Sequence, residues 1–401
     1  MKNKPTSEKA KSASKVSSRS HLGERVPRLR FLGFEGEWES ISLGKACICF
    51  SGGTPDSTNK ELYGGTIPFI RSAEIDEAET QLFLTNEGME QSSAKEVKVG
   101  DLLLAMYGAN SGEVAISKIN GAINQAILCI RSSSLDTHFL KCILERDKER
   151  ITNRYLQGGQ GNLSAEIIKE LRFPFPALDE QHKISHFLEL VENRIAAQRK
   201  LVELLKKHKR GLLREVFEEK IDGDCYSFSE IASRRNEKIA PTKDSCLDCI
   251  ELEHIEPETG MLLGCVPLNG QNSLKNLCKP SDIVFGKLRP YLRKFVFAEN
   301  ECAVSSETWV LTAVDGIYPK FLFYLIQSEP FMRAASVSSG TKMPRSEWSN
   351  VANAKFYVPD RTQQEIIAAC FSEIDSRILA SQRILTAAQA YKRGLSQQIF
   401  V

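Results

Sequence analysis

Two long stretches of the chain share one pattern of apolar and polar positions. Residues 176–217 and 359–400 align without a gap at an offset of 183 positions, and 11 of the 42 paired residues are identical. In both stretches apolar residues recur at alternating spacings of three and four, which is typical of an α-helix wound on a partner helix. We therefore predict two long helices with matching paired faces. These faces comprise Ile184, Leu188, Val191, Ile195, Gln198, Val202, Leu205, Lys209 and Leu212 in the first copy, and Ile367, Phe371, Ile374, Ile378, Ser381, Leu385, Lys392 and Leu395 in the second.

Polar residues interrupt this apolar seam at the same two places in both copies. Gln198 corresponds to Ser381, and Lys209 corresponds to Lys392. Polar groups in a helix seam cost stability but can fix the register of the pairing and the choice of partner. Because both interruptions recur, we interpret them as positions that set register.

The part of the chain before the first long helix alternates short apolar runs with turn residues. Residues 96–106 and 121–131 are typical of strands, the first with a turn at Gly100-Asp101, and residues 138–156 are typical of a helix. The segment Phe173-Pro174-Phe175-Pro176 cannot be helical throughout, so it closes this first unit.

The first long helix follows this segment, with Asp179 as the predicted N-cap and an end near Lys220. Residues 226–358 then repeat the plan of the first unit, since Asp282–Lys287 matches Asp101–Met106 at an offset of 181. The long helices agree better with each other than the globular parts do. We infer an α/β (α+β) fold of two similar globular units, each followed by a long helix. The closer agreement of the helices indicates that both have the same role, whereas the divergence of the globular units indicates two variants of a second role.

Composition and charge place few further limits on the chain. Its 401 residues allow two to three domains, and 42% hydrophobic residues is ample for buried cores. The net charge of +2 points to no polyanionic partner, but residues 1–30 hold nine Lys or Arg against Glu8 and Glu24. That local charge of +7 leaves −5 for the rest of the chain. We predict a disordered basic tail over residues 1–25, which either holds nucleic acid weakly or is simply solvated.

The sequence favours a cytoplasmic protein without a membrane partner. No apolar run approaches the roughly 20 residues that span a bilayer, and the N-terminus has no signal-peptide core. The 11 cysteines lack the spacing of a disulfide framework and suit a reducing cytosol. Cys246 and Cys249, with His254 nearby, lack the second close pair that a zinc site needs, so we expect no bound metal.

Signatures of catalysis are mostly absent from the sequence. The glycine-rich segments 52–55 and 158–161 do not continue into the G-K-[ST] of a phosphate-binding loop, and there is no G-x-G-x-x-G, G-x-S-x-G or H-E-x-x-H. His182 and His186 have the helical spacing of a metal pair but no evident third ligand. Together these absences favour a binding protein with no catalytic residues.

Loops between the predicted strands carry side chains suited to reading base edges in DNA. Arginine pairs bidentately with guanine, and asparagine and glutamine pair with adenine. The candidates are Thr54, Arg71, Tyr107, Asn110, Asn124, Gln125, Gln160 and Asn162 in the first unit, and Lys287, Arg289, Tyr291, Arg293, Lys342 and Arg345 in the second. Residues 287–294 are the densest mix of cations with an aromatic ring, although an ordinary basic surface loop has the same composition. The sequence therefore permits DNA reading without demonstrating it.

The first long helix is also basic along part of its length. Residues 194–214 contain eight Lys or Arg and one acidic residue, Glu203. This charge is either a solvated face or a stripe directed at phosphates or at an acidic partner.

Several short motifs follow one another along residues 26–401. They are Val26-Pro27-Arg28-Leu29-Arg30-Phe31, Gly36-Glu37-Trp38, Gly52-Gly53-Thr54-Pro55, Gly65-Thr66-Ile67-Pro68-Phe69-Ile70, Gly100-Asp101-Leu102-Leu103, Lys287-Leu288-Arg289-Pro290-Tyr291-Leu292, and the Pro176, Glu180-Gln181, Ile184 entry to the long helix. With this layout the chain resembles the specificity (S) subunit of type I restriction-modification systems. The second unit departs from the pattern, because it lacks the Gly-Gly-Thr-Pro run and its helix begins Thr362-Gln363-Gln364, where Glu-Gln is commoner.

The resemblance implies an α/β target-recognition domain in each half, at residues 26–176 and 221–359, and long helices at residues 177–220 and 360–401. The helices would pair antiparallel as a coiled coil, hold the domains apart and dock two methyltransferase subunits. Each domain would read one half of a bipartite, asymmetric site in double-stranded DNA. S-adenosylmethionine, ATP and Mg²⁺ would bind to the methyltransferase and restriction subunits, whereas this chain would bind no cofactor and would not be an enzyme.

The length of the helices fits this role, and three other interpretations stay open. About 40 residues at 1.5 Å each make a helix of roughly 60 Å, nearly two turns of B-DNA, which could set the gap between half-sites. Alternatively, the chain serves a methyltransferase-only or type IIB-like complex. It could also be a self-contained methyltransferase or nuclease, although neither a [DN]-P-P-[YF] element nor a carboxylate-lysine cluster is evident. Finally, it could be a coiled-coil scaffold whose units bind protein or carbohydrate.

Overall fold

In the computed structural model, residues 25–156, 162–218, 222–337 and 343–401 are described. The chain forms two compact units, so that each long helix contributes residues to both. Unit 1 runs to Asn193 and includes Ala388–Val401, and unit 2 comprises Arg194–Ala387. The predicted basic tail lies outside the described residues, except for Arg25.

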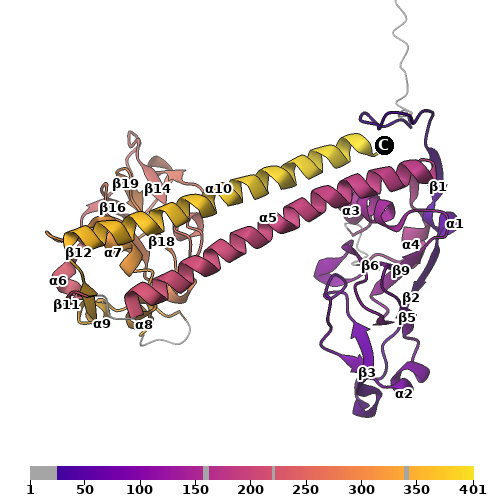
Figure 1. Ribbon diagram of the computed structural model, residues 1–401, viewed down its shortest axis with the longest axis horizontal. Coiled ribbons are helices and arrows are strands. Elements are labelled where there is room, and N and C mark those ends of the chain that lie inside the picture. Colours follow the sequence, from indigo (N-terminus) through magenta and orange to yellow (C-terminus); the bar gives the residue numbers. More distant parts are fainter. Residues whose placement is uncertain (1–24, 157–161, 219–221, 338–342) are drawn as a thin grey trace, which may run out of the picture. The chain divides into compact units, whose positions relative to one another are not determined.

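Unit 1 is built on two four-stranded sheets and a two-stranded ribbon (Figure 1). Its strands are β1 Glu39–Ser42, β2 Ile48–Ser51, β3 Tyr63–Ile70, β4 Phe83–Leu84, β5 Lys95–Val97, β6 Leu102–Ala105, β7 Val114–Ile116, β8 Gly121–Ile123, β9 Ile127–Arg131 and β10 Arg172–Phe175. The first sheet has the order β2-β9-β6-β7 and is antiparallel. The second has the order β4-β3-β8-β5, in which β3 and β8 are parallel. β1 pairs with β10 in the ribbon.

The helices of unit 1 supply the other half of its core. They are α1 Leu43–Ala46, α2 Asn86–Glu90, α3 Thr137–Leu156 and α4 Ala165–Glu170, with 3-10 turns η1 Lys60–Leu62 and η2 Gly108–Asn110. The apolar face of α3 packs against the first sheet, because Phe139 and Ile143 share one buried cluster with Leu102, Leu104 and Leu128. β6 and β9 are buried almost along their whole length, as expected for central strands without polar alternation.

Of the two strand predictions for unit 1, that for residues 96–106 is confirmed and that for residues 121–131 is wrong. The turn within residues 96–106 is confirmed, since Gly100 has a φ of +94° and separates β5 from β6. Residues 121–131, expected to be one strand, form two strands. Asn124 breaks the run, because its Oδ1 accepts the backbone N–H of Ala126 at 3.1 Å and closes a turn.

The first described residues and the C-terminal residues both pack into unit 1. The Phe400 ring lies 5.1 Å from that of Phe139, centroid to centroid. Leu29 donates its backbone N–H to the carbonyl of Gln398 at 3.0 Å. Arg30 makes a bidentate ion pair with Glu180, both bonds 2.8 Å long. The Val26–Phe31 motif therefore joins the start of the unit to the last turns of the C-terminal helix.

Unit 2 repeats the plan of unit 1. Its strands are β11 Asp224–Ser227, β12 Ala232–Arg235, β13 Lys238–Ile239, β14 Asp248–Ile250, β15 Val266–Pro267, β16 Lys275–Cys278, β17 Ile283–Gly286, β18 Phe295–Phe297, β19 Cys302–Val304, β20 Thr308–Ala313 and β21 Lys355–Val358. The antiparallel sheet β12-β20-β17-β18 corresponds to β2-β9-β6-β7. The sheet β13-β16-β19-β14-β15 again contains one parallel pair, β14 with β19, and β11 pairs with β21. The predicted fold of two similar α/β units is thus confirmed.

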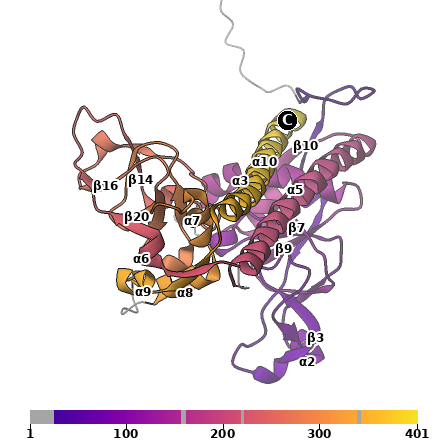
Figure 2. The ribbon, with the colours of Figure 1, turned by 60° about the vertical axis from the view of Figure 1, so that its left-hand side comes forward.

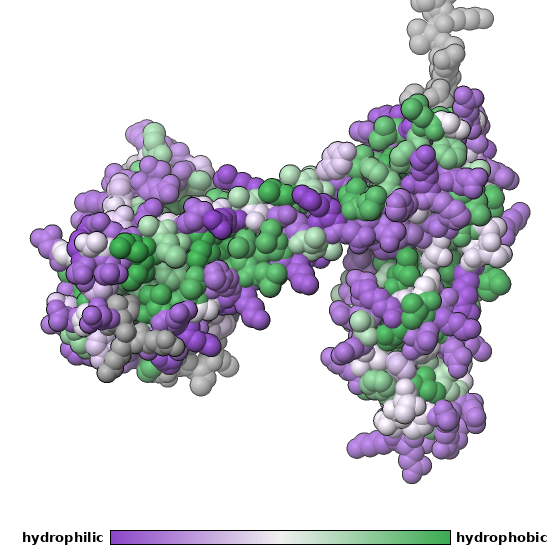
Figure 3. Space-filling view, viewed as in Figure 1, coloured by the Kyte–Doolittle hydropathy of each residue, from purple (hydrophilic) through white to green (hydrophobic). Residues whose placement is uncertain are grey.

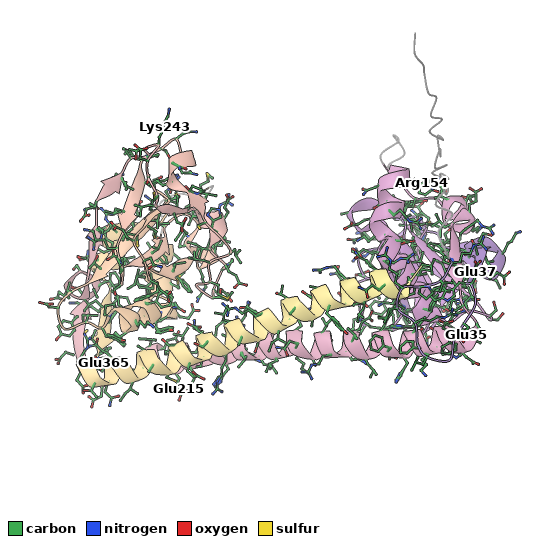
Figure 4. All side chains as sticks on the ribbon, turned by 90° about the horizontal axis from the view of Figure 1, so that it is seen from above. Glu35, Glu37, Arg154, Glu215, Lys243 and Glu365 are labelled. Atoms are coloured by element: carbon green, nitrogen blue, oxygen red, sulfur yellow. The ribbon has the colours of Figure 1, made fainter. Side chains whose placement is uncertain are left out.

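Short helices cover the first sheet of unit 2 and connect it to the long helix. They are α6 Phe228–Ile231, α7 Pro319–Leu325, α8 Glu329–Ser336 and α9 Trp348–Ala352, with 3-10 turns η3 Leu252–His254, η4 Leu268–Gly270 and η5 Pro290–Leu292. Figure 2 shows α7 close to the C-terminal helix, where the rings of Tyr324 and Phe371 are 5.1 Å apart. Lys243, on the loop between β13 and β14, lies at the end of the unit away from Glu365 at the start of that helix (Figure 4).

The two long helices are α5 Leu178–Glu218 and α10 Arg361–Ile399, and they pack together antiparallel. Asp179 was predicted as the N-cap of α5, but the helix begins one residue before it. The carbonyl of Ala177 accepts the first helical hydrogen bonds, and Asp179 lies in the first turn. In α10 the equivalent role falls to Asp360, whose Oδ1 accepts the N–H of Gln363 at 2.9 Å. No helix in the described part of the chain is long and apolar enough to cross a membrane.

Candidate nucleic-acid interface

In each unit a central strand of the first sheet leads into a 3-10 turn, and three loops meet there. In unit 1, Met106 lies between β6 and η2, donates its backbone N–H to Ala126 at 2.8 Å and accepts that of Leu163 at 3.0 Å. The η2 turn, the β8–β9 turn and the segment before α4 therefore lie side by side. They carry Tyr107, Asn110, Asn124, Gln125 and Asn162 of the predicted set. Gln160 lies outside the described residues.

Thr54 belongs to the same group. Its Oγ1 lies 2.5 Å from Oε1 of Gln125 and donates to it, and both side chains are exposed. Asn162 is exposed as well, whereas Tyr107 and Asn110 are half-buried. The predicted contact side chains that gather here are all uncharged amides and hydroxyls.

The two glycines before Thr54 have a packing role. A Cβ on Gly52 would lie 1.8 Å from the carbonyl oxygen of Ile123, and one on Gly53 would lie 2.0 Å from Oγ of Ser93. A side chain at Gly52 would therefore push this loop away from β8, and one at Gly53 would push it away from the segment before β5. The Gly-Gly-Thr-Pro motif brings the backbone close to the β8–β9 turn and so places Thr54 beside Gln125.

Arg71 lies at the same edge of the second sheet as Asn124, because it follows β3 and the parallel β8 ends beside it. Its guanidinium is held by Glu74 at 2.7 and 3.0 Å and by Oε1 of Gln81 at 2.9 Å. The hydrogen bonds from Arg71 lower the pKa of the buried Glu74 carboxyl to about 2. The sequence identified the arginine but missed its counter-charge, which a carboxylate three residues later could have signalled.

The corresponding loop of unit 2 has a constrained backbone. Arg289 and Arg293 have φ of 51° and 49°, a left-handed conformation that costs on the order of 1–3 kcal/mol at a non-glycine residue. Two backbone hydrogen bonds hold them: Arg289 donates to Pro344 at 2.8 Å, and Arg293 accepts from Glu258 at 2.9 Å. Pro290 is buried between them, and Tyr291 stands 59% exposed at the tip. The loop therefore presents its side chains from a fixed backbone.

The predicted cations of this loop differ in how far they are already paired. Arg293 turns inward to an ion pair with Glu329 on α8, so it supports the loop. Arg345 makes two bonds of 3.0 and 3.2 Å to Glu307 and lowers the pKa of that carboxyl. Within the described residues, the side chains of Lys287, Arg289 and Tyr291 form no hydrogen bond or ion pair. Lys342 lies outside the described residues.

The predicted helix seam is buried or half-buried at every position in both helices. Its polar members meet across the seam. Gln198 donates from Nε2 to the carbonyl of Ser381 at 3.0 Å. Lys209 pairs with Asp375 at 2.7 Å in unit 2, and Lys392 pairs with Glu192 at 2.6 Å in unit 1. Because Asp375 is the repeat counterpart of Glu192, the two ion pairs are one arrangement used twice.

These ion pairs differ in their surroundings. The Lys209 side chain is 4% exposed, and its burial lowers the pKa of the ammonium despite the nearby Asp375. Glu192 also contacts Lys141 at 3.1 Å and His138 at 3.4 Å. Burial alone would raise the pKa of Glu192, but hydrogen bonds from His138 and Lys392 and the charge of Lys141 hold it well below its usual range. The unit 1 pair is therefore part of a network, and the unit 2 pair is more isolated.

Much of the basic charge on α5 is neutralised within unit 2. Lys206 and Arg210 pair with Glu256 and Glu258 at 3.7 and 2.9 Å. With Lys209 and Arg214, four of the eight basic residues in the 194–214 segment have carboxylate partners on this chain. The acidic partner considered for this stripe is thus partly the protein itself.

One group of potential metal ligands occurs in unit 1, formed by His138, Cys142 and Glu192. Its geometry does not fit an ion, because Nε2 of His138 faces Glu192 while Nδ1 faces the Cys142 sulfur at 3.6 Å. One metal could take only one of these ring nitrogens. Burial raises the pKa of the Cys142 thiol to about 12, which disfavours the thiolate, and two lysines already neutralise Glu192. The group is an ion-pair network that joins α3, α5 and α10.

The chain thus consists of two units of one plan, with different loop chemistry at equivalent places and a repeated pair of long helices. Residues 35–207 match the family model described as the type I restriction modification DNA specificity domain. The chain is therefore similar to the specificity subunits of type I restriction-modification systems.

Relatives and solved structures resemble the chain over nearly its whole length. The specificity subunit of the type I restriction enzyme MjaVIII from Methanocaldococcus jannaschii is 22% identical over 392 residues, covering 89% of this chain and 88% of the relative. The crystal structure of a type I S subunit from M. genitalium superposes with a TM-score of 0.58 at 16% identity, covering 94% of this chain and 99% of that one. A chain from a study of type I complex assembly has a TM-score of 0.54 at 17% identity, covering 90% of this chain and 96% of that one.

Proposed function

We propose that this chain reads a bipartite, asymmetric site in double-stranded DNA, one half with each unit, and docks two methyltransferase subunits and restriction subunits on its helix pair. The observation that carries the proposal is a contrast within the chain. The helices keep 11 of 42 residues identical, while the turn after β6 reads Tyr107-Gly108-Ala109-Asn110 and the turn after β17 reads Leu288-Arg289-Pro290-Tyr291. Equivalent loops thus carry different side chains on one backbone plan.

The chemistry of the two surfaces supports two different half-sites. The unit 1 group offers neutral amides, which pair with adenine in the major groove, and hydroxyls. The unit 2 loop offers Arg289, which suits guanine, with Lys287 as a phosphate contact and Tyr291 as an exposed ring. Arg345 is oriented by its two hydrogen bonds to Glu307. A carboxylate that holds one edge of a guanidinium in this way orients the other edge for bidentate contacts with a base. The site read by this chain would therefore be asymmetric.

A second stripe on each long helix supports partner docking. Each residue of this stripe comes one position before a seam residue or the repeat counterpart of one in the sequence, so the stripe has the same alternating spacing of three and four. The flanking stripe comprises Arg194, Ala197, Leu201, Leu204, His208 and Gly211 on α5, and Arg377, Ala380, Ile384, Ala387, Tyr391 and Gly394 on α10. Leu201, Leu204, Ile384 and Tyr391 are 44–61% exposed, and apolar surface is visible along the helices in Figure 3. A lone exposed leucine is ordinary, but a stripe repeated at equivalent positions indicates a partner.

Glycines in this stripe point to a closely packed partner. Gly211 and Gly394 lie inside long helices, where glycine costs about 1 kcal/mol relative to alanine. A Cβ at either position would meet nothing within 4 Å, so no contact in the described chain requires glycine there. The close approach of a helix from another subunit would explain why both copies keep it. Two identical methyltransferase subunits fit two equivalent stripes.

The remaining chemistry is assigned to the partners. S-adenosylmethionine would bind to the methyltransferase subunits, and ATP and Mg²⁺ to the restriction subunits, in the cytoplasm. This chain would contribute sequence recognition and positioning, consistent with a family of non-catalytic subunits.

The proposal is tested by selecting bound duplexes from a random pool with the chain and its methyltransferase partner. We expect two short, different base motifs separated by a constant unread gap. The matched control is the complex with Lys287, Arg289 and Tyr291 all replaced by alanine, which should lose one motif and keep the other. Recovery of no motif, with the partner bound, would refute DNA reading and favour a scaffold.

A further inference from the structure

Two buried glutamines make the same contact, one in each unit. Gln181 and Gln364 are identical across the repeat and are 1% and 2% exposed. In unit 1, Oε1 of Gln181 accepts the backbone N–H of Asp136 at 3.0 Å, and its Nε2 donates to the carbonyl of Pro176 at 2.8 Å. Both ends of the amide are therefore used, and both partners are backbone groups.

In unit 2 the same two bonds recur. Oε1 of Gln364 accepts the backbone N–H of Tyr318 at 2.7 Å, and Nε2 donates to the carbonyl of Pro359 at 2.9 Å and to that of Gly316 at 3.3 Å. The partner side chains differ between the units, an aspartate in one and a tyrosine in the other. Because the bonds go to the backbone, this contact survives the divergence of the globular parts.

The partners hold equivalent places in the fold. Asp136 precedes α3 and caps it, since its Oδ1 accepts the N–H of Phe139 at 2.7 Å. Tyr318 is the N-cap residue of α7. Pro176 and Pro359 are the residues at which the closing strand gives way to the long helix. Each glutamine thus ties the start of a long helix to the start of the first helix after the sheet of its globular part.

This tie adds directed hydrogen bonds to a junction that apolar packing also holds, through Leu188 in unit 1 and Phe371 in unit 2. The covalent link between each globular part and its long helix is a single strand, β10 or β21, that belongs to a two-stranded ribbon. A fork of two directed hydrogen bonds from one planar amide cannot rotate without breaking both. Rolling of the long helix against the globular part would leave buried backbone groups without partners, which is strongly unfavourable.

We infer that Gln181 and Gln364 are positioning residues that fix each DNA-reading surface on its long helix and so keep the gap between half-sites constant. The inference rests on the proposed function, because a constant gap has meaning only if the two units read two half-sites of one DNA site. Neither glutamine lies in the loops that would contact DNA, so neither should choose bases. Their effect is on the spacing between the half-sites.

The test uses the complex with its methyltransferase partner and a pool in which the two half-sites are separated by gaps of varied length. Gln364→Met removes all three hydrogen bonds of the side chain, and Gln364→Glu keeps the shape and the acceptor but, when ionised, loses the donor. We expect both variants to select the same half-site bases while gaps one base pair shorter or longer become about tenfold better tolerated. The control is Val351→Ala, a buried change on α9 that destabilises unit 2 without touching this contact.

A gap profile as sharp in the Gln364 variants as in the Val351→Ala control would overturn the inference, because the glutamine would then be only structural. Amide hydrogen exchange of the whole chain provides an arm that does not depend on DNA. The Tyr318 amide should exchange about tenfold faster in Gln364→Met, and unchanged protection would also overturn the inference. If the wild-type complex selects no bipartite site while Tyr318 loses protection, the contact stands and the proposed function fails.

Discussion

The buried ion pair between Lys209 and Asp375 gives the sharpest prediction about the helix seam. Replacing Asp375 with leucine leaves the Lys209 ammonium 4% exposed with no other carboxylate paired to it among the described residues. The ring of Tyr324 is 5.4 Å away and offers only a cation–π contact. Removing one partner of a buried pair costs about 3–5 kcal/mol, whereas replacing both with apolar residues is often neutral. We expect Asp375→Leu to destabilise unit 2 by that amount, and Lys209→Met with Asp375→Leu to restore most of it.

The assay is denaturant unfolding followed by tryptophan fluorescence. Trp309 and Trp348 lie in unit 2 and Trp38 in unit 1, so a Trp38→Phe background reports unit 2 alone. The loss should also depend on pH. The folded-state pKa of Lys209 lies below its ordinary value of about 10.4, so the unfolded chain binds more protons and stability rises with pH between these values. In Asp375→Leu this recovery should be larger than in the wild type.

The matching change in unit 1 serves as the comparison. Glu192→Leu removes the partner of Lys392, but Lys392 keeps Glu145 at 3.2 Å and is 24% exposed. Its cost should therefore be smaller than that of Asp375→Leu. A loss below about 1 kcal/mol for Asp375→Leu, or no recovery in the double variant, would refute the assignment of this pair as a buried, desolvated interaction.

Three further predictions concern other parts of the chain. Gly211→Ala and Gly394→Ala should each raise stability by up to about 1 kcal/mol yet weaken binding of the methyltransferase, with Glu203→Ala as the exposed control; unchanged binding by titration calorimetry would contradict the docking stripe. Lys287→Ala should weaken DNA binding about equally for all sequences and reduce the salt dependence of log Kd, and a change in base preference would show that it reads bases. Glu74→Gln should destabilise unit 1 at pH 7 but not near pH 2, because the lowered pKa of Glu74 gives stability that is present above about pH 5 and lost as the pH falls toward 2. Urea unfolding followed at Trp38 checks this difference, and a constant loss at both pH values would contradict it.

The repeat in the sequence was enough to predict the long helices, their seam and its polar positions. What the repeat could not supply is the partner of each polar group. Lys209 and Lys392 stand out as cations among apolar residues, but the choice of Asp375 and Glu192 depends on the antiparallel register. Asp179 was misplaced as a cap because a helix can begin at Leu178 using the carbonyl of Ala177 alone.

For the candidate site, the position of the loops was predictable, but the carboxylate partners of the arginines were not. Residues distant in sequence, such as Thr54 and Gln125, meet because Gly52 and Gly53 allow the backbones to approach closely. Arg71, Arg293 and Arg345 were placed among the contact candidates, but each has a carboxylate partner supplied by tertiary packing. Composition alone cannot separate a paired arginine from an unpaired one. Identity at Gln181 and Gln364 was visible in the repeat, yet their role emerged only from the backbone groups they join.

The central claim is that the two units read different halves of one DNA site. It is tested most directly by comparing, base by base, the motifs selected by the wild-type complex and by the complex carrying Arg289→Ala. The account predicts that one half-site stays unchanged, while one or two positions of the other lose about 1–3 kcal/mol of discrimination. A uniform change in both half-sites, or an unchanged motif with unchanged affinity, would contradict it.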